Sequence, residues 1–277
     1  MNRYCARGLA GIMVLILVAR TSICGQAASP PASPASTCFL IGPPITPRPA
    51  GFNNWSREQR LESLIRSRDQ AAFLMDFSAG TVGGEFDGLV LWGFKTIQSA
   101  NADPLVPLAV AHMYELTANG SSVDANHRYE LMRRATVYRL INVSMTFVDA
   151  SACDDDGAGQ ESIVNSMTGA KNALAWLKTV SPAERDDVVQ RALAAESASW
   201  GKRAVSLSLC WNSRDALMHT DPAKQKNVGT KVENGVTVTE IYLPTVAGWL
   251  PALRPDAEKR RIGIHNQVAQ ILTKITR

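Results

Sequence analysis

The sequence predicts a mainly α-helical protein, a bundle or array of antiparallel helical hairpins with one small β-hairpin near the C-terminus. Three observations predict this fold. Helix-start signals recur along the chain after residue 53, and each is followed by apolar residues at helical spacing. The connections between these segments are short, which favours antiparallel neighbours. An Asn-Gly pair, Asn234-Gly235, separates two runs rich in β-branched residues.

The first helix is predicted over residues 57–77. Ser56 and Gln59 have the spacing of a capping box, in which each side chain accepts a hydrogen bond from the backbone N–H of the other residue. Apolar residues follow at helical spacing, namely Leu61, Leu64, Ile65, Ala72 and Met75. This combination of a start signal and an apolar face predicts a helix.

The next segment is ambiguous. A glycine-rich stretch over residues 80–88 precedes an apolar run over 89–94. A run of this length fits either a buried helix or a strand. Our prediction is a helix over 85–99.

Further helices are predicted from their start signals. Asp103-Pro104 and Ser181-Pro182 each place a capping side chain before a proline, which the first helical position tolerates. The predicted helices cover about 103–119, 123–148 and 160–179, a segment that begins at Pro182, and a final segment that begins near Pro255.

The chain changes character after residue 203. Residues 203–211 alternate between polar and apolar side chains, which fits a strand or the end of a helix. The β-hairpin is predicted at about 228–243, because asparagine and glycine are the residues that most readily adopt the positive φ that both positions of a tight hairpin turn require.

The N-terminus has the order of a secretory signal peptide. Two arginines precede an uncharged run over residues 8–19, and small residues follow this run. The run is too short to span a bilayer, which takes roughly 20 residues. We therefore expect a signal peptide over 1–27, cleaved after Ala27 or Ala28, and a periplasmic or secreted protein.

Alternatives stay open at this end of the chain. A retained N-terminal anchor would keep the same domain outside the cytoplasm. In a membrane-anchored lipoprotein, Cys24 would carry the lipid, although Ile23 is larger than the usual preceding residue. Residues 28–52 form a proline-rich extended leader, which either tethers the helical domain of residues 53–277 or lies on its surface through residues 39–41.

The net charge argues against nucleic acid as a partner. The chain is formally +4, and residues 1–27 carry three arginines and no acid. The remainder has 29 − 3 = 26 basic and 25 acidic residues, or about +1. No basic block with interleaved aromatics is present. The expected partner is another protein, with membrane contact only through the signal segment or a lipid on Cys24.

The cysteines predict one disulfide. Cys5 and Cys24 lie in the signal segment, which leaves Cys38, Cys153 and Cys210. An oxidising compartment favours a disulfide, and we expect Cys153–Cys210 because both residues lie in the helical domain. A nucleophilic cysteine is the alternative, but no histidine lies near any of the three in sequence.

No catalytic residue, cofactor or metal is predicted. The acidic stretch 149–159 is predicted as a loop, and it fails the EF-hand spacing in both registers that place a glycine at position 6. Serine-hydrolase and phosphate-binding glycine motifs are absent from the sequence. Glu85 and Asp87 form a carboxylate pair, but any chain with this many acids contains such pairs. The four histidines lack the spacing of a helical zinc pair, and they are His112, His127, His219 and His265.

Aromatic residues gather in the part that contains the hairpin. Aromatics are enriched at the centres of protein interfaces, but they are also ordinary core residues. The candidate binding surface consists of Trp211, Asn234, Gly235, Tyr242 and Trp249.

One segment resembles a Sel1-type or tetratricopeptide-type helix pair. The resemblance rests on Ala111-His-Met-Tyr114, Gly120, Val123-Asp124 and Ala135, which together match about 25 residues. The Leu-Gly pair that the family has before the tyrosine is missing here, and no second copy follows at the expected period. The resemblance implies a helical surface that binds protein.

These observations favour an exported protein that is not an enzyme and that acts by binding another protein. An inhibitor or immunity protein and an envelope-assembly factor are two versions of this hypothesis. A cell-envelope hydrolase is the alternative, and it would need a pocket that brings His112 or His219 to a carboxylate. A structural module tethered by the leader is a third interpretation.

Overall fold

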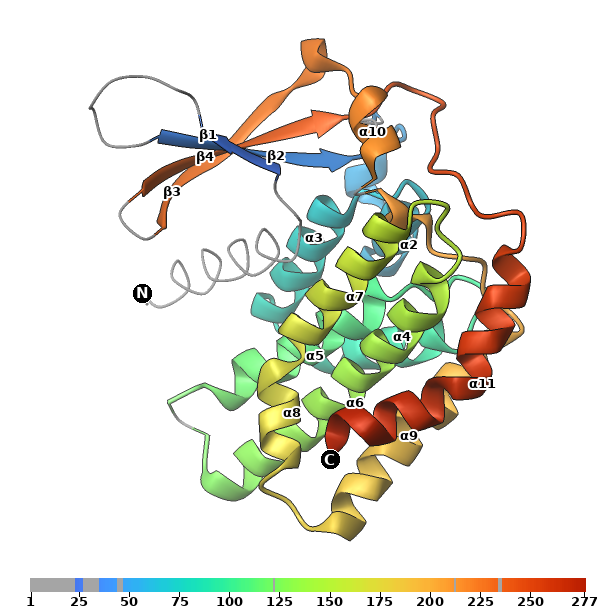
Figure 1. Cartoon of the computed structure of the whole chain (residues 1–277). Helices are drawn as coiled ribbons and strands as arrows, with labels where there is room; N and C mark the ends of the chain where they lie inside the picture. The colour runs from blue at the N-terminus through green and yellow to red at the C-terminus, as the bar shows by residue number, and fades with distance from the viewer. Residues whose placement is uncertain (1–22, 27–34, 44–46, 122, 212, 234–235) are drawn as a thin grey trace.

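The computed structural model describes residues 23–26, 35–43, 47–121, 123–211, 213–233 and 236–277 (Figure 1). Within these residues the chain is mainly α-helical, and the helices pack as a bundle with a small sheet at one end of the molecule. The predicted fold class is confirmed. In this described part, no helix has both the length and the apolar composition of a bilayer-spanning segment.

The first predicted helix is two helices, α2 (Arg57–Arg66) and α3 (Gln70–Val82). The Ser56 capping box forms as predicted. The helix then ends because Arg68 has a φ of 59° in the left-handed region, which few residues other than glycine adopt. Asp69 caps α3 by accepting a hydrogen bond from the Ala72 N–H. The prediction of one helix over 57–77 is therefore wrong at this break.

The apolar run over 89–94 lies in a helix, α4 (Phe86–Ile97). The prediction of a helix over 85–99 is therefore confirmed. α4 is followed by α5 (Leu105–Ala118) and α6 (Ala125–Ala150). α5 and α6 are antiparallel, as two hydrogen bonds between them show. The Asn142 side chain, in the second half of α6, donates to the Pro104 carbonyl at the start of α5. The Arg128 side chain, near the start of α6, donates to the Ala118 carbonyl at the end of α5.

The predicted helix over 160–179 is also two helices, α7 (Asp156–Gly169) and α8 (Lys171–Leu177), separated at Ala170. α9 (Pro182–Trp200) begins at the predicted Ser181 cap. The remaining helices are α10 (Arg214–Met218) and α11 (Ala257–Thr276). Short 3₁₀ helices are η1 (Phe52–Asn54), η2 (Leu207–Cys210) and η3 (Pro222–Lys224).

The apolar core is centred on α6, against which α5, α7, α8, α9 and α11 all pack. Burying a large aliphatic or aromatic side chain contributes about 1.5–3 kcal/mol relative to its exposure. Fully or almost fully buried members of this core include Leu61, Leu64, Phe73, Val106, Val110, Leu140, Val143, Leu177, Val188 and Leu272.

The sheet has the order β1-β2-β4-β3. The predicted hairpin is present as the antiparallel pair β3 (Lys226–Glu233) and β4 (Val236–Pro244). Its turn, Asn234-Gly235, lies outside the described residues. Figure 1 shows the sheet outside the helical body, with α10 beside it.

The other two strands come from the N-terminal segment. β2 (Ala35–Gly42) lies in the predicted leader and pairs in parallel with β4. β1 (Ile23–Gln26) lies in the segment predicted as signal peptide and pairs antiparallel with β2, with Cys24 opposite Cys38. Residues 35–42 of the predicted leader are therefore extended, and they form a paired strand of the sheet.

Candidate functional site

A cavity of about 190 Å³ lies where the α2–α3 turn, the segment before α5 and residues 204–208 meet. Leucine, isoleucine, valine and alanine side chains form its apolar lining. Its polar lining consists of Arg66, Arg68, Asn101, Asp103, Ser206 and Ser208. We call it the Arg68 cavity.

Asp103 is held by hydrogen bonds on both carboxylate oxygens. The Ser206 hydroxyl donates to Oδ2 at 2.6 Å, and the Leu105 N–H donates to Oδ1 at 2.8 Å. The Ser206 and Ser208 hydroxyl oxygens are also 2.6 Å apart. Burial raises the pKa of Asp103, and the two hydrogen bonds oppose this shift.

Two arginines line the cavity, Arg66 and Arg68. Among the described residues, no carboxylate lies within ion-pair distance of Arg68. Its guanidinium carbon lies 5.6 Å from the centroid of the Trp211 ring, within the range of a cation–π contact. Burial lowers the pKa of Arg68, and the negative charge of Asp103 opposes that shift. The side chain therefore carries a partly desolvated positive charge.

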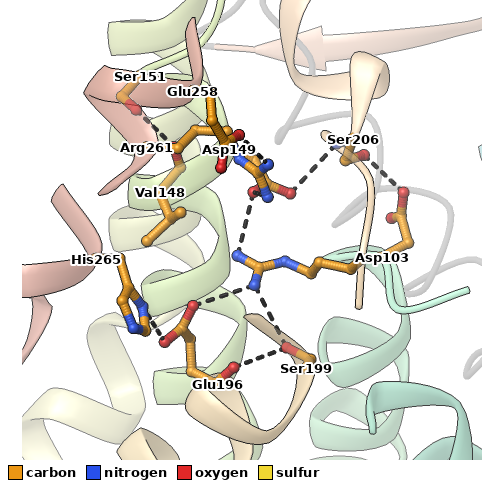
Figure 2. A network of polar contacts seen from close by, with 11 residues as sticks. Asp103, Val148, Asp149, Ser151, Glu196, Ser199, Ser206, Glu258, Arg261 and His265 are labelled. Carbon is orange, nitrogen blue, oxygen red and sulfur yellow. Dashed lines mark hydrogen bonds and ion pairs between the residues drawn. The ribbon is translucent and has the colours of Figure 1, made fainter. Parts of the chain in front are cut away.

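A buried ion network lies behind the cavity, and Figure 2 shows most of it. Arg203 bridges Asp149 of α6 and Glu196 of α9, each at 3.1 Å, and all three side chains are fully buried. From α11, Arg261 approaches Asp149 at 3.4 Å, and His265 Nδ1 lies 2.9 Å from the Glu196 carboxylate. We call these five residues the Arg203 network.

The Arg203 network fixes one wall of the cavity. The second oxygen of Asp149 accepts a hydrogen bond from the Ser206 N–H at 3.2 Å, so the residue that binds Asp103 is held from both sides (Figure 2). Burial raises the pKa of Asp149, and the charges of Arg203 and Arg261 oppose this shift. Burial thus favours the neutral form of the Asp149 carboxyl group, whereas the neighbouring positive charges favour its ionised form.

Trp200 covers the network from one side. Its ring stacks on His265 with centroids 4.3 Å apart and an interplanar angle of 5°. The guanidinium of Arg261 lies 4.8 Å from the same ring centroid. Trp200 is therefore partly buried in contact with charged groups.

The predicted disulfide is seen. Cys153 and Cys210 are bonded, with their Cα atoms 5.3 Å apart. The bond joins the end of α6 to η2, directly after the cavity wall. The Asp154 and Arg254 backbones add hydrogen bonds between this region and the segment before α11.

An exposed apolar surface lies beside the sheet. His219 stacks on Trp249 with centroids 5.2 Å apart, and the His219 carbonyl accepts a hydrogen bond from the Val246 N–H. Met218, Leu250 and Val246 are 81, 51 and 40% exposed. We define the Trp249 patch as Met218, His219, Val246, Trp249 and Leu250.

Two of the predicted binding residues, Trp211 and Trp249, lie in contact with each other. Trp211 is buried, and its ring meets Trp249 edge to face at 5.8 Å. Trp249 itself is partly buried within the patch. Tyr242 is partly buried, and its hydroxyl donates to the Pro43 carbonyl. Asn234 and Gly235 lie outside the described residues.

The histidines do not share a site. His112 lies 3.7 Å from Glu115, which is bound in two places by the buried guanidinium of Arg139. His127 is exposed at the start of α6, whereas His219 and His265 stack on different tryptophans. Within the described part of the chain, no three histidine, cysteine or acidic side chains are grouped as metal ligands.

The acidic residues have structural roles. Asp149 belongs to the last turn of α6 and not to a loop, contrary to the prediction for 149–159. Asp155 caps α7 by accepting from two backbone N–H groups. Glu85 forms an ion pair with Arg57 that lowers the pKa of the glutamate, and Asp87 lies in the exposed first turn of α4.

Sequence reasoning missed the Arg68 cavity and the Arg203 network. Asp103 was recognised only as a helix cap, and Arg203 only as part of an alternating segment. A usable signal was present at Asp69-Gln70, where a capping residue in the middle of a predicted helix indicates a break. Comparison with protein-family models, curated proteins and solved structures finds no match to this chain.

Proposed function

We propose that this chain is an exported protein that is not an enzyme and that binds another protein through the Trp249 patch. The observation that carries the proposal is the grouping of three highly exposed apolar side chains, Met218, Val246 and Leu250, around a tryptophan. Scattered exposed apolar residues need no explanation, but contiguous ones mark interaction surfaces.

The patch has the features of an interface centre. Tryptophan is enriched among the residues that contribute most to binding, and such residues are usually held in place before the partner arrives. The Trp249 ring packs edge to face against the buried Trp211 ring, and Trp211 in turn contacts Arg68. The Cys153–Cys210 disulfide fixes the chain immediately before Trp211.

Two features support export. The N-terminal order of basic, apolar and small residues is typical of a signal peptide. A disulfide within the domain fits an oxidising compartment. An inhibitor or immunity protein and an envelope-assembly factor both fit this location and a surface of this kind.

The hydrolase alternative has less support. It required a pocket that combines His112 or His219 with a carboxylate, and neither histidine lines the Arg68 cavity. His112 lies beside Glu115 between α5 and α6, and His219 belongs to the Trp249 patch.

The test is site-specific crosslinking in the exporting cell. A photoreactive amino acid replaces Leu250 in the full chain, and the matched control carries it at Val164, which is exposed on α7. We expect one stoichiometric partner from Leu250 and none from Val164. The identified partner is then titrated calorimetrically against purified variants.

The double variant Met218→Asp, Leu250→Asp should bind the partner about 100-fold more weakly, equivalent to about 2.7 kcal/mol. Val164→Asp should leave the affinity unchanged. Full affinity in the double variant would refute the patch as the interface. Loss of binding only on substitution of Asn234-Gly235 would instead assign the interface to the hairpin turn.

A further inference from the structure

Arg68 combines a left-handed backbone, a place in the cavity lining and a charge without an ion-pair partner among the described residues. Its backbone has a φ of 59°, a conformation in which a residue with a Cβ is strained. Arg68 is one of the residues that line the cavity, and it has no ion-pair partner among the described residues. Strained backbone and unpaired charge occur together at ligand sites more often than elsewhere.

The cavity has a net positive charge. Arg66 and Arg68 contribute two positive charges and Asp103 at most one negative charge, because burial raises its pKa, so the sum is at least +1. Arg66 is largely exposed and lies 3.9 Å from Glu62, so the charge inside the cavity is mainly that of Arg68. Both oxygens of Asp103 already accept hydrogen bonds.

We propose that the Arg68 cavity binds the carboxylate of a small monoanion with a short apolar chain, with the Arg68 guanidinium as its principal donor. A guanidinium presents paired N–H groups that match the two oxygens of a carboxylate. The apolar lining, including Leu64, Leu105 and Leu207, accommodates the chain.

Size and charge narrow the ligand class. A volume of about 190 Å³ corresponds to roughly six water molecules, so a ligand of about that many heavy atoms fits. A dianion such as phosphate is disfavoured, because the Asp103 carboxylate lines the same cavity. The carboxylate is either that of a free short-chain acid or that of an apolar residue at the C-terminus of a polypeptide.

The proposal does not rest on the Trp249 patch, and it is tested with defined small molecules. Butyrate is titrated into the full-length ¹⁵N-labelled protein, and the Arg68 side-chain resonance and the amide resonances of 101–105 and 204–208 are followed. We expect saturable shifts confined to these residues. Butyramide, the neutral isostere, should cause none, and phosphate should bind at least 10-fold more weakly.

Three variants sharpen the test. Arg68→Gln should weaken butyrate binding at least 10-fold, whereas Arg191→Gln, on the exposed face of α9, should not change it. Asp103→Asn should tighten binding several-fold, because it removes the opposing charge while its oxygen still accepts from the Leu105 N–H and its NH2 group can donate to the Ser206 hydroxyl oxygen. N-acetylvaline distinguishes the two sources, since it binds only if the carboxylate can enter from a polypeptide end.

Equal binding of butyramide and butyrate would overturn the proposal. So would unchanged binding in Arg68→Gln, or weaker binding in a folded Asp103→Asn variant. Because Asp103→Asn predicts a gain, the proposal stays falsifiable even if Arg68→Gln fails to fold. Failure here would leave the crosslinking result at Leu250 untouched, so the two proposals are independently refutable.

Discussion

The middle and the C-terminal end of α6 are buried in different ways. Along its middle, Leu140 and Val143 enter an apolar core whose members interact through shape and exclusion of water. At its C-terminal end, Asp149 enters the Arg203 network, in which Arg203 and Arg261 are its charged partners. Apolar contacts are non-directional, whereas buried charges require specific partners. We therefore expect the apolar core to tolerate substitution and the Arg203 network not to tolerate it.

The largest effect is expected from breaking the network at Arg203. Arg203→Met should lower the free energy of unfolding by about 3–5 kcal/mol, because Asp149 and Glu196 would remain buried without their shared partner. Leu61→Met, at a fully buried apolar position, should lower it by less than about 1.5 kcal/mol. Urea unfolding of both variants measures the difference, and similar values would contradict the distinction between the two cores.

The disulfide is expected to have the next largest effect. Replacing both Cys153 and Cys210 by Ala should lower the free energy of unfolding by about 2–4 kcal/mol, because a constraint across a separation of 57 residues is removed from the unfolded chain. Thermal unfolding of the variant and of the reduced wild type should agree. A variant as stable as the oxidised protein would show that the network alone holds this region.

The smallest effect concerns a single half-buried acid. Burial, reinforced by the charge of Asp155, raises the pKa of Glu161 on α7 to about 7 from its usual 4.5. Folding therefore favours the protonated form, and its contribution to stability is complete below about pH 4.5 and is lost as the pH rises through about 7. Glu161→Gln should unfold with a free energy about 1 kcal/mol higher than the wild type at pH 8, after allowance for solvent screening.

At pH 4 the two proteins should be equally stable, because Glu161 is then neutral in the folded wild type. Chemical denaturation at pH 4, 6 and 8 measures this trend. A constant difference between the two proteins across this range would show that the carboxyl group of Glu161 does not titrate as its environment implies.

Local signals in the sequence were sufficient for most helices. The caps at Ser56 and Ser181 form as predicted, since a cap involves residues only three positions apart. The hairpin pairing and the Cys153–Cys210 bond were also predicted. These features depend on short-range patterns or on a small number of alternatives.

The cavity and the network could not be predicted in the same way. Arg203 is 54 residues from Asp149, and Arg261 is 112 residues from it. No periodicity connects partners at such separations, and any of the 29 basic residues could pair with any of the 25 acids. The break at Arg68 was missed because the left-handed residue is an arginine and not the glycine that usually indicates such a conformation.

The parallel pairing of β2 with β4 has a consequence for the order of assembly. β2 is synthesised near the beginning of the chain, yet Ile41 aligns with Leu243 near its end. This register cannot form until almost the whole polypeptide has emerged, by which time the helices between the two strands can already have packed. Contacts between distant segments form slowly because a long loop must close first. The pairing of β2 with β4 therefore closes one of the longest loops in the chain, and we expect it to form after the local helical contacts.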